Sequence, residues 1–192
     1  MLRVPLWDPI PRDSRAFLGD RAKRIRVLDD HELAAGKLVA LLARGASRDL
    51  FDARQVLTSD AFDSGRLRLA FVVYGGLNRV DWRLVSIDAV TTTVDDVKRQ
   101  LLPMLRGDIR PSSEDVERWT GDLIDETRAR LSVVLPLADH EIEFLELLNG
   151  EGKIEASLLT KDIDMQRRIT ANPGLRWKAL NVQQHIGDGR AG

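Results

Sequence analysis

Residues 29–52, which read DDHELAAGKLVALLARGASRDLFD, carry the clearest helical pattern of the chain. Asp29 suits the N-cap of a first helix, because Glu32 three residues later completes a capping box. Gly45 suits the end of that helix, since glycine readily takes the left-handed conformation that follows a helix. Ser47 suits the N-cap of a second helix. This pattern predicts two helices joined by a short turn.

Lys37 is the unusual residue of the first predicted helix. At about 100° per residue, it falls within the apolar arc, whose members are Leu33, Ala34, Leu38, Leu41 and Leu42. An ammonium group on such an arc either reaches water along its apolar stem or holds an anion, a carboxylate or a phosphate. Periodicity alone favours the first explanation. The second places a phosphate ligand in a cleft beside Lys37.

Arg48, Asp49 and Asp52 share one face of the second predicted helix. One interpretation is structural, because acidic residues suit the first turn of a helix and Arg48 and Asp52 are spaced as a surface ion pair. The other is functional: a carboxylate here orients Lys37 or Arg48 toward a triphosphate, and the short turn brings Lys37 close to Asp49. Spacing alone favours the structural interpretation.

The rest of the chain continues the helical pattern after a short β region. Alternation at residues 2–7 and 23–28 predicts two strands, the first at an edge because Pro5 has no N–H to donate. Further helices are predicted at 66–77, 93–105, 113–135, 139–150, 162–169 and 175–184. We expect a mainly α fold with a strand stub over 1–28, a helical domain over 29–186 and a flexible tail over 187–192. Two strands alone make no stable sheet, so the stub either packs on the helices or belongs to a sheet completed from elsewhere.

Composition excludes several classes of site. The 192 residues are 43% hydrophobic and 31% charged, which is typical of a globular chain. They include no cysteine, so disulfides, thiol nucleophiles and cysteine-ligated metals are excluded. His31, His140 and His185 are too scattered to suggest a histidine metal site. The longest apolar run, 69–74, is too short to cross a membrane, and we expect a cytoplasmic location.

Motifs for phosphate or metal binding are weak. Neither G-x-x-x-x-G-K-S/T nor G-x-G-x-x-G occurs. Asp162 and Asp164 have the D-x-D spacing of metal-binding carboxylates, but acidic residues are also expected at a helix start. We favour the helix start, since no glycine-rich loop precedes these residues.

Residues 33–52 resemble the AbiEii/AbiGii nucleotidyltransferase toxin family, whose signature is a lysine, then Ala-Leu, then Arg, then Arg-Asp-x-x-Asp. Three later stretches are also similar to one branch of the family, namely 71–79, 135–137 and 177–182. The resemblance implies the helical C-terminal lobe of a polymerase-β-like nucleotidyltransferase. It also implies nucleotide transfer from an NTP to RNA, with tRNA acceptor ends as the known substrates, Mg²⁺ as cofactor and a cognate antitoxin as partner.

Matching the family's motifs residue by residue assigns the candidate site. The resemblance implies that Lys37 and Asp49 are catalytic and that Lys37, Arg48 and Asp52 bind the nucleotide. The family's Gly-Ser loop and Mg²⁺-binding carboxylate pair precede the part similar to residues 2–7, and no position here matches them. No metal ligand is therefore assigned, and we expect the chain to be inactive without a separate N-terminal lobe.

A second hypothesis comes from another class of protein. Unpaired edges of the predicted strands invite pairing with another chain. On this hypothesis the chain is a non-enzymatic binding module for an antitoxin, an RNA or a separate catalytic lobe.

Overall fold

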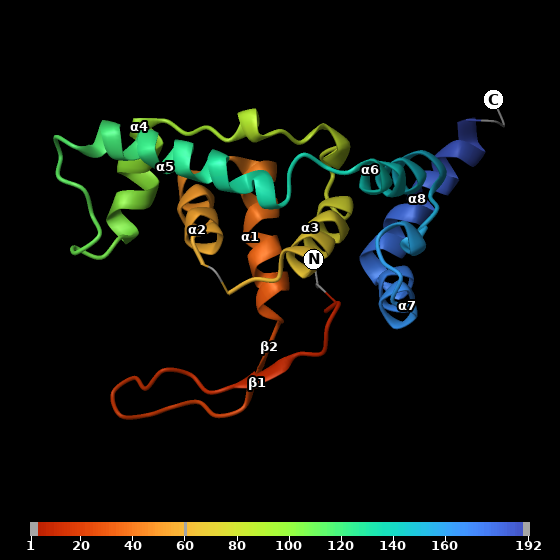
Figure 1. Cartoon of the computed structure of the whole chain (residues 1–192), viewed down its shortest axis with the longest axis horizontal. Coiled ribbons are helices and arrows are strands. Elements are labelled where there is room, and N and C mark those ends of the chain that lie inside the picture. The colour runs from red at the N-terminus through yellow and green to blue at the C-terminus, as the bar shows by residue number, and fades with distance from the viewer. Residues whose placement is uncertain (1–3, 60, 190–192) are drawn as a thin grey trace.

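The computed structural model describes residues 4–59 and 61–189, which form a helical body and one small hairpin (Figure 1). The helices are α1 Asp30–Arg44, α2 Ser47–Leu57, α3 Ser64–Gly76, α4 Val94–Asp96, α5 Val116–Arg130, α6 Asp139–Glu146, α7 Ile163–Ala171 and α8 Pro173–Gly189. Short π and 3₁₀ turns prolong α4 to Met104, α5 to Val133 and α6 to Glu151. The expected mainly α fold with a short β region at the N-terminus is confirmed.

Two helices, α1 and α3, form the centre of the body. Residues 70–76 of α3 are all buried, as its apolar sequence predicts. α1 packs on α3. The buried apolar side chains of α1 are small or aliphatic, namely Ala34, Ala35, Leu38, Val39 and Leu41. α2 packs on α1 and α5 on one side of this centre, while α6, α7 and α8 lie on the other side (Figure 1). The candidate site lies on the α1–α2 side.

The hairpin projects from the body beyond the start of α1 (Figure 1). Strands β1, Ile10–Arg12, and β2, Ile25–Val27, pair antiparallel, with Ile10 opposite Val27. A bridge between Phe17 and Asp20 closes its tip. The second predicted strand is confirmed, and the first lies later in the chain than we expected.

The prediction of a strand over 2–7 is wrong for the described residues 4–7. The N–H groups of Leu6 and Trp7 donate to the Glu32 carboxylate at 2.8 and 3.2 Å, so these residues bind a side chain of α1 and not a neighbouring strand. The Tyr74 hydroxyl donates to the same carboxylate. Leu6 and Glu32 are both fully buried, so this contact ties the N-terminal segment to the core.

Both predicted helix caps differ in detail. Asp29 caps α1, but its carboxylate accepts from the His31 N–H at 2.9 Å. The capping box is not formed, because Glu32 turns inward to the N-terminal segment. Ser47 is the first residue of α2 and not its cap, which is Ala46.

The C-terminal helix is longer than predicted. α8 continues to Gly189, so residues 187–189 of the expected flexible tail form its last turn, and residues 190–192 lie outside the described part of the chain. Among the described residues, none of the helices combines the length and the apolar character that crossing a membrane requires.

Candidate functional site

The turn between α1 and α2 brings the charged residues of the candidate site together. Gly45 ends α1 with a left-handed φ of 65°, and its N–H donates to the Leu41 carbonyl at 2.8 Å. Ala46 alone separates Gly45 from the start of α2 at Ser47. The two helices are therefore neighbours, as the short turn predicts.

Asp49 pairs with Arg44 across this turn. The Arg44 Nε and Nη2 atoms donate to the two oxygens of Asp49 at 3.1 and 2.8 Å. The Asp49 side chain is only 12% exposed, whereas the Arg44 side chain is 66% exposed. A buried carboxylate thus fixes the plane of an exposed guanidinium. The expected approach of Lys37 to Asp49 is not formed, because Arg44 occupies this carboxylate.

Lys37 pairs with Asp52 instead. Its Nζ lies 2.5 Å from Asp52 Oδ2, and the two side chains are 52% and 41% exposed. Lys37 does not lie in the buried arc of α1, because that arc is centred on Ala35 and Leu38 while Leu33 is exposed. The carboxylate that contacts Lys37 is thus Asp52, and its role toward a triphosphate stays a prediction.

Arg48 points to a different neighbour. Its Nη1 lies 3.7 Å from the sulfur of Met104, and within the described part of the chain it forms no ion pair with Asp52. Arg44 at the end of α1 and Arg48 in the first turn of α2 therefore have different partners, Asp49 and Met104.

These residues line a hollow of about 560 Å³, which we call the corner hollow. Its lining residues are Arg44, Ala46, Arg48, Asp49, Phe51, Asp52, Leu101, Met104 and Leu105. One wall is charged and comes from the α1–α2 turn, and the other is apolar and comes from the end of the α4 segment. Sequence analysis missed Arg44 and this apolar wall, since nothing in the spacing places residues 101–105 beside α2.

Asp96 holds the start of α2 in place. Its Oδ2 accepts from the Ser47 N–H at 3.0 Å, while the Ser47 hydroxyl donates to the Asp96 carbonyl at 3.4 Å. The side chain and the N–H of Ser47 hold the pKa of the Asp96 carboxyl below its usual value. A carboxylate from the α4 segment thus caps the helix that carries Arg48, Asp49 and Asp52.

A second hollow lies beside Lys37. It measures about 640 Å³. Its lining combines apolar side chains, among them Ile10, Leu33, Val56 and Phe62, with the polar Asp29, Asp30, His31 and Lys37. We call it the side hollow. Since Lys37 lines the side hollow and Asp52 lines the corner hollow, their ion pair stands between the two.

One family model matches the part of the chain that contains the α1–α2 corner. The model of the AbiEii nucleotidyl transferase toxin, of the type IV toxin–antitoxin systems, matches residues 1–125. The chain belongs to this family. No curated protein and no solved structure matches the chain.

The AbiEii match contains the whole α1–α2 corner and ends within α5. Membership of a type IV toxin–antitoxin family implies an antitoxin as partner. The similarity that we noted at 135–137 and 177–182 lies outside the matched residues and stays a prediction.

The Mg²⁺ that AbiEii resemblance implies has no matching ligand set here. The described residues contain no group of three acidic, histidine or cysteine side chains able to hold a metal ion. Asp49 and Asp52 each face a cation, and Asp162 caps α7 by accepting from the N–H groups of Asp164 and Met165. The structure therefore confirms the helix-start interpretation of the D-x-D pair.

Proposed function

We propose that this AbiEii-family chain binds the triphosphate of an NTP at the α1–α2 corner and serves the transfer of a nucleotide to RNA. The observation that carries the proposal is the guanidinium of Arg44, which the buried Asp49 holds in the lining of the corner hollow. Arginine has five N–H donors in a plane, and the pair with Asp49 uses two of them. The remaining donors are available to phosphate oxygens.

The cations of the corner are open to an anion in competition with carboxylates. Lys37 and Arg44 pair with Asp52 and Asp49, Arg48 forms no ion pair within the described residues, and Asp96 caps the start of α2, so the nearby charges balance. The N-terminus of α2 adds the partial positive charge of its helix dipole. A triphosphate brings more negative charge than the two carboxylates, so it competes for the same cations.

The opposite wall suits a nucleobase. Phe51, Leu101, Met104 and Leu105 give the hollow an apolar surface next to its charged one. Small-molecule sites commonly combine such a surface with a few polar groups that fix orientation. A nucleotide placed with its phosphates on the corner would rest its base against residues 101–105.

The proposal assigns separate roles to the four family residues. Lys37 and Arg48 contact phosphate oxygens, as the resemblance implies for them. Asp52 orients Lys37 through the 2.5 Å contact, and Asp49 orients Arg44. In this arrangement Asp49 is a positioning residue, although the resemblance implies a catalytic one.

The context of the reaction follows from the family. We propose an RNA acceptor, with tRNA first among the candidates, and action in the cytoplasm under control of an antitoxin. The alternative is a non-enzymatic module that binds an antitoxin, an RNA or a separate catalytic lobe. Nucleotide binding separates the two, because the module has no need of it.

The test is equilibrium binding of each of the four NTPs to the full chain and to Arg44→Gln and Lys37→Gln. Hydrogen bonds to charged groups contribute about 1.5–3 kcal/mol, so each variant should bind its best NTP roughly ten- to a hundredfold more weakly. Lys161→Gln is the matched control, since Lys161 is exposed and makes no ion pair within the described residues. Equal affinity of all four proteins, or no NTP binding by the wild type, would refute the proposed site.

A further inference from the structure

The hairpin is the most basic segment of the chain. Residues 10–27, which we call the basic arm, carry six Lys or Arg residues and two Asp residues, a net charge of +4 on a chain whose net charge is −1. Its six cations are Arg12, Arg15, Arg21, Lys23, Arg24 and Arg26. The rest of the chain is therefore net acidic, and positive charge is concentrated on one projecting ribbon.

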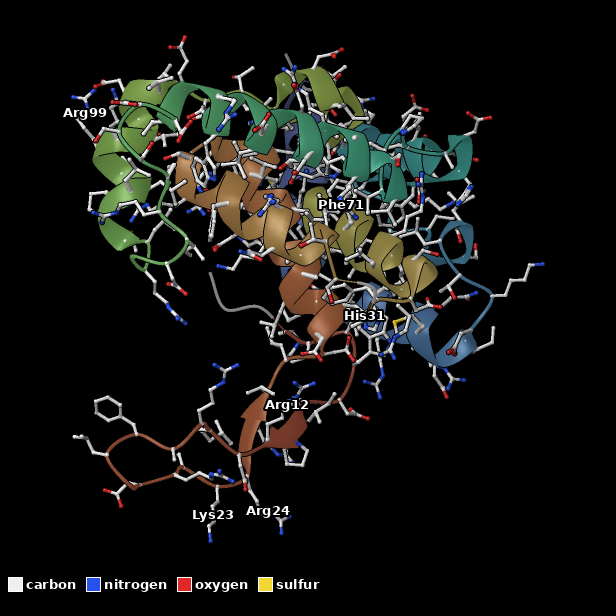
Figure 2. The ribbon with its side chains drawn as sticks, turned by 60° about the vertical axis from the view of Figure 1, so that its left-hand side comes forward. Arg12, Lys23, Arg24, His31, Phe71 and Arg99 are labelled. Carbon is white, nitrogen blue, oxygen red and sulfur yellow. The ribbon has the colours of Figure 1, made fainter. Side chains whose placement is uncertain are left out.

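Most of this charge is not used within the fold. Arg12 pairs with Asp30 at the base of the arm. Arg168 lowers the pKa of the Asp8 carboxyl, and the charge of Arg26 adds a smaller effect in the same direction. The side chains of Arg15, Arg21, Lys23 and Arg24 make no ion pair or hydrogen bond within the described residues, and all four residues are exposed. Lys23 and Arg24 point away from the helices (Figure 2).

The tip of the arm presents apolar side chains to solvent. Phe17 is 78% exposed and Leu18 is 90% exposed. Leu18 has a φ of 50°, in the left-handed region that a branched apolar residue rarely adopts. The tip buries neither side chain in the core, so both are accessible to another molecule.

We propose that the basic arm binds the RNA acceptor, with its cations on the phosphates and Phe17 stacked on a base. The identity of this polymer rests on the proposed function, and the arm as its binding surface goes beyond it. Four unpaired cations suit a polyanion, and aromatic side chains are the usual platforms for unpaired RNA bases.

The position of the arm favours RNA over a membrane or a protein. Ile10 at the base of the arm and Lys37 line the same side hollow. An RNA strand that runs along the arm therefore arrives beside Lys37. The reacting end of the RNA acceptor has to meet the nucleotide there. Binding to an anionic membrane would use the cations but not the proximity of the arm to Lys37. Binding to a protein that pairs with the strand edges would use neither the cations nor Phe17.

The test measures binding of a labelled RNA hairpin with a single-stranded 3′ end to the full chain over a range of salt concentrations. The arm variant replaces Arg15, Arg21, Lys23 and Arg24 with Gln. Its control removes the same charge elsewhere, at Arg79, Lys98, Lys161 and Arg176, which are exposed and make no ion pair within the described part of the chain. Each lost phosphate contact lowers the slope of log affinity against log salt by about 0.7.

We expect the arm variant to bind the RNA on the order of 100-fold more weakly near 0.1 M salt, with a slope smaller by about 3, and the control to bind like the wild type within a few fold. Phe17→Ala should bind about tenfold more weakly with an unchanged slope, because stacking involves no counterion release. Thermal unfolding should be equal in all these proteins, since every substituted side chain is exposed.

Two results would overturn the inference. One is equal loss of RNA affinity in the arm variant and its control, which would show that charge alone matters. The other is undiminished RNA binding by the arm variant. This result overturns the inference even if the variant loses binding to phosphatidylserine vesicles or to a protein partner. NTP binding measured on the same proteins separates the two proposals: RNA binding through the arm without NTP binding refutes the proposed function and leaves the arm in place.

Discussion

Arg44 and Asp49 form the most informative residue pair of the candidate site. Removing the negative charge of Asp49 would by simple electrostatics strengthen the binding of a triphosphate. The geometry predicts the reverse for Asp49→Asn, about a five- to tenfold loss of NTP affinity, because Arg44 loses the partner that fixes its plane. In an Arg44→Gln background the same change should have little further effect, which a double-mutant cycle on NTP affinity measures.

The matched control for this cycle is Asp108→Asn, which breaks an exposed pair with Arg106 outside the corner hollow. It should leave NTP affinity unchanged. Tighter NTP binding by Asp49→Asn would mean that Arg44 needs no positioning.

Gly75 tests the packing at the end of α3. A Cβ at this position would lie 2.0 Å from Trp82 Nε1 and 2.2 Å from Cδ1 of the same fully buried indole. Gly75→Ala should therefore destabilise the chain by about 1–3 kcal/mol, the usual cost of overpacking a core. Urea unfolding followed by circular dichroism measures this difference.

Gly121 in α5 is the control, because a Cβ there meets nothing within 4 Å. Gly121→Ala should stabilise the chain by about 0.5–1 kcal/mol, since alanine favours a helix interior. Destabilisation of similar size in both variants would contradict the specific role of the Trp82 contact.

At the scale of elements, the helices follow from the sequence and the strand stub follows only in part. Leu6 alternates with its neighbours as a strand residue would, but its N–H binds the buried carboxylate of Glu32, 26 residues away. The same long-range contact removes Glu32 from the capping box. A local sequence pattern contains no information about such distant partners, and the first strand was therefore predicted at the wrong residues.

The candidate site shows the same limit. The lysine and the Arg-Asp-x-x-Asp block are visible in the sequence, and the short turn correctly makes their helices neighbours. The actual pairing, Lys37 with Asp52 and Asp49 with Arg44, depends on side-chain direction across the turn. The apolar wall at 101–105 comes from a segment about fifty residues away in the chain, whose docking on α2 no local signal predicts.

Asp96 gives a prediction for the element that carries the site. Because the folded-state pKa of Asp96 is lowered from 3.8, its stabilisation of the fold is present above that value and is lost as the pH falls through the folded pKa. Asp96→Asn should cost about 1 kcal/mol at neutral pH, as for loss of a helix cap. The difference from the wild type should shrink below pH 4, which urea unfolding at several pH values measures.

Asp95→Asn is the neighbouring control, since Asp95 is exposed and pairs only with Arg99 in the described part of the chain. Asp95→Asn should unfold with the same free energy as the wild type at neutral pH, and the two should stay equal as the pH falls. A pH-independent difference between Asp96→Asn and the wild type would contradict the ionised cap.

At the scale of the whole molecule, contacts join the family-matched region to the helices that follow it. Arg68 in α3 donates to both oxygens of the buried Glu141 in α6, at 2.6 and 2.7 Å. Lys178 in α8 donates to the carbonyls of Gly76 and Asn78, at 2.8 and 3.0 Å, just where α3 ends. The C-terminal helices thus complete the core that holds the site.

Lys178 tests this connection. Lys178→Met leaves two backbone acceptors without their donor and should destabilise the chain by about 1–3 kcal/mol at neutral pH. Burial lowers the pKa of Lys178 below its usual 10.5, so the unfolded chain binds more protons between the folded pKa and 10.5. The free energy of unfolding of the wild type should therefore rise with pH in that window.

Lys178→Met should not show this rise in the free energy of unfolding. Urea unfolding at several pH values across the window measures the difference. Lys161→Met serves as the control, because Lys161 is exposed and unpaired within the described residues. If Lys178→Met and the wild type have parallel pH profiles, Lys178 is not the buried group that joins α8 to α3.

Photo-cross-linking of an azido-purine NTP to the full chain, with the labelled peptide identified by mass spectrometry, tests the central claim most directly. A base that rests on the apolar wall of the corner hollow should label residues 101–105 or Phe51, and excess unlabelled NTP should abolish the label. The label should also be lost in Arg44→Gln. Labelling confined to the side hollow, at Leu33, Val56 or Phe62, or labelling that persists in Arg44→Gln would contradict the account.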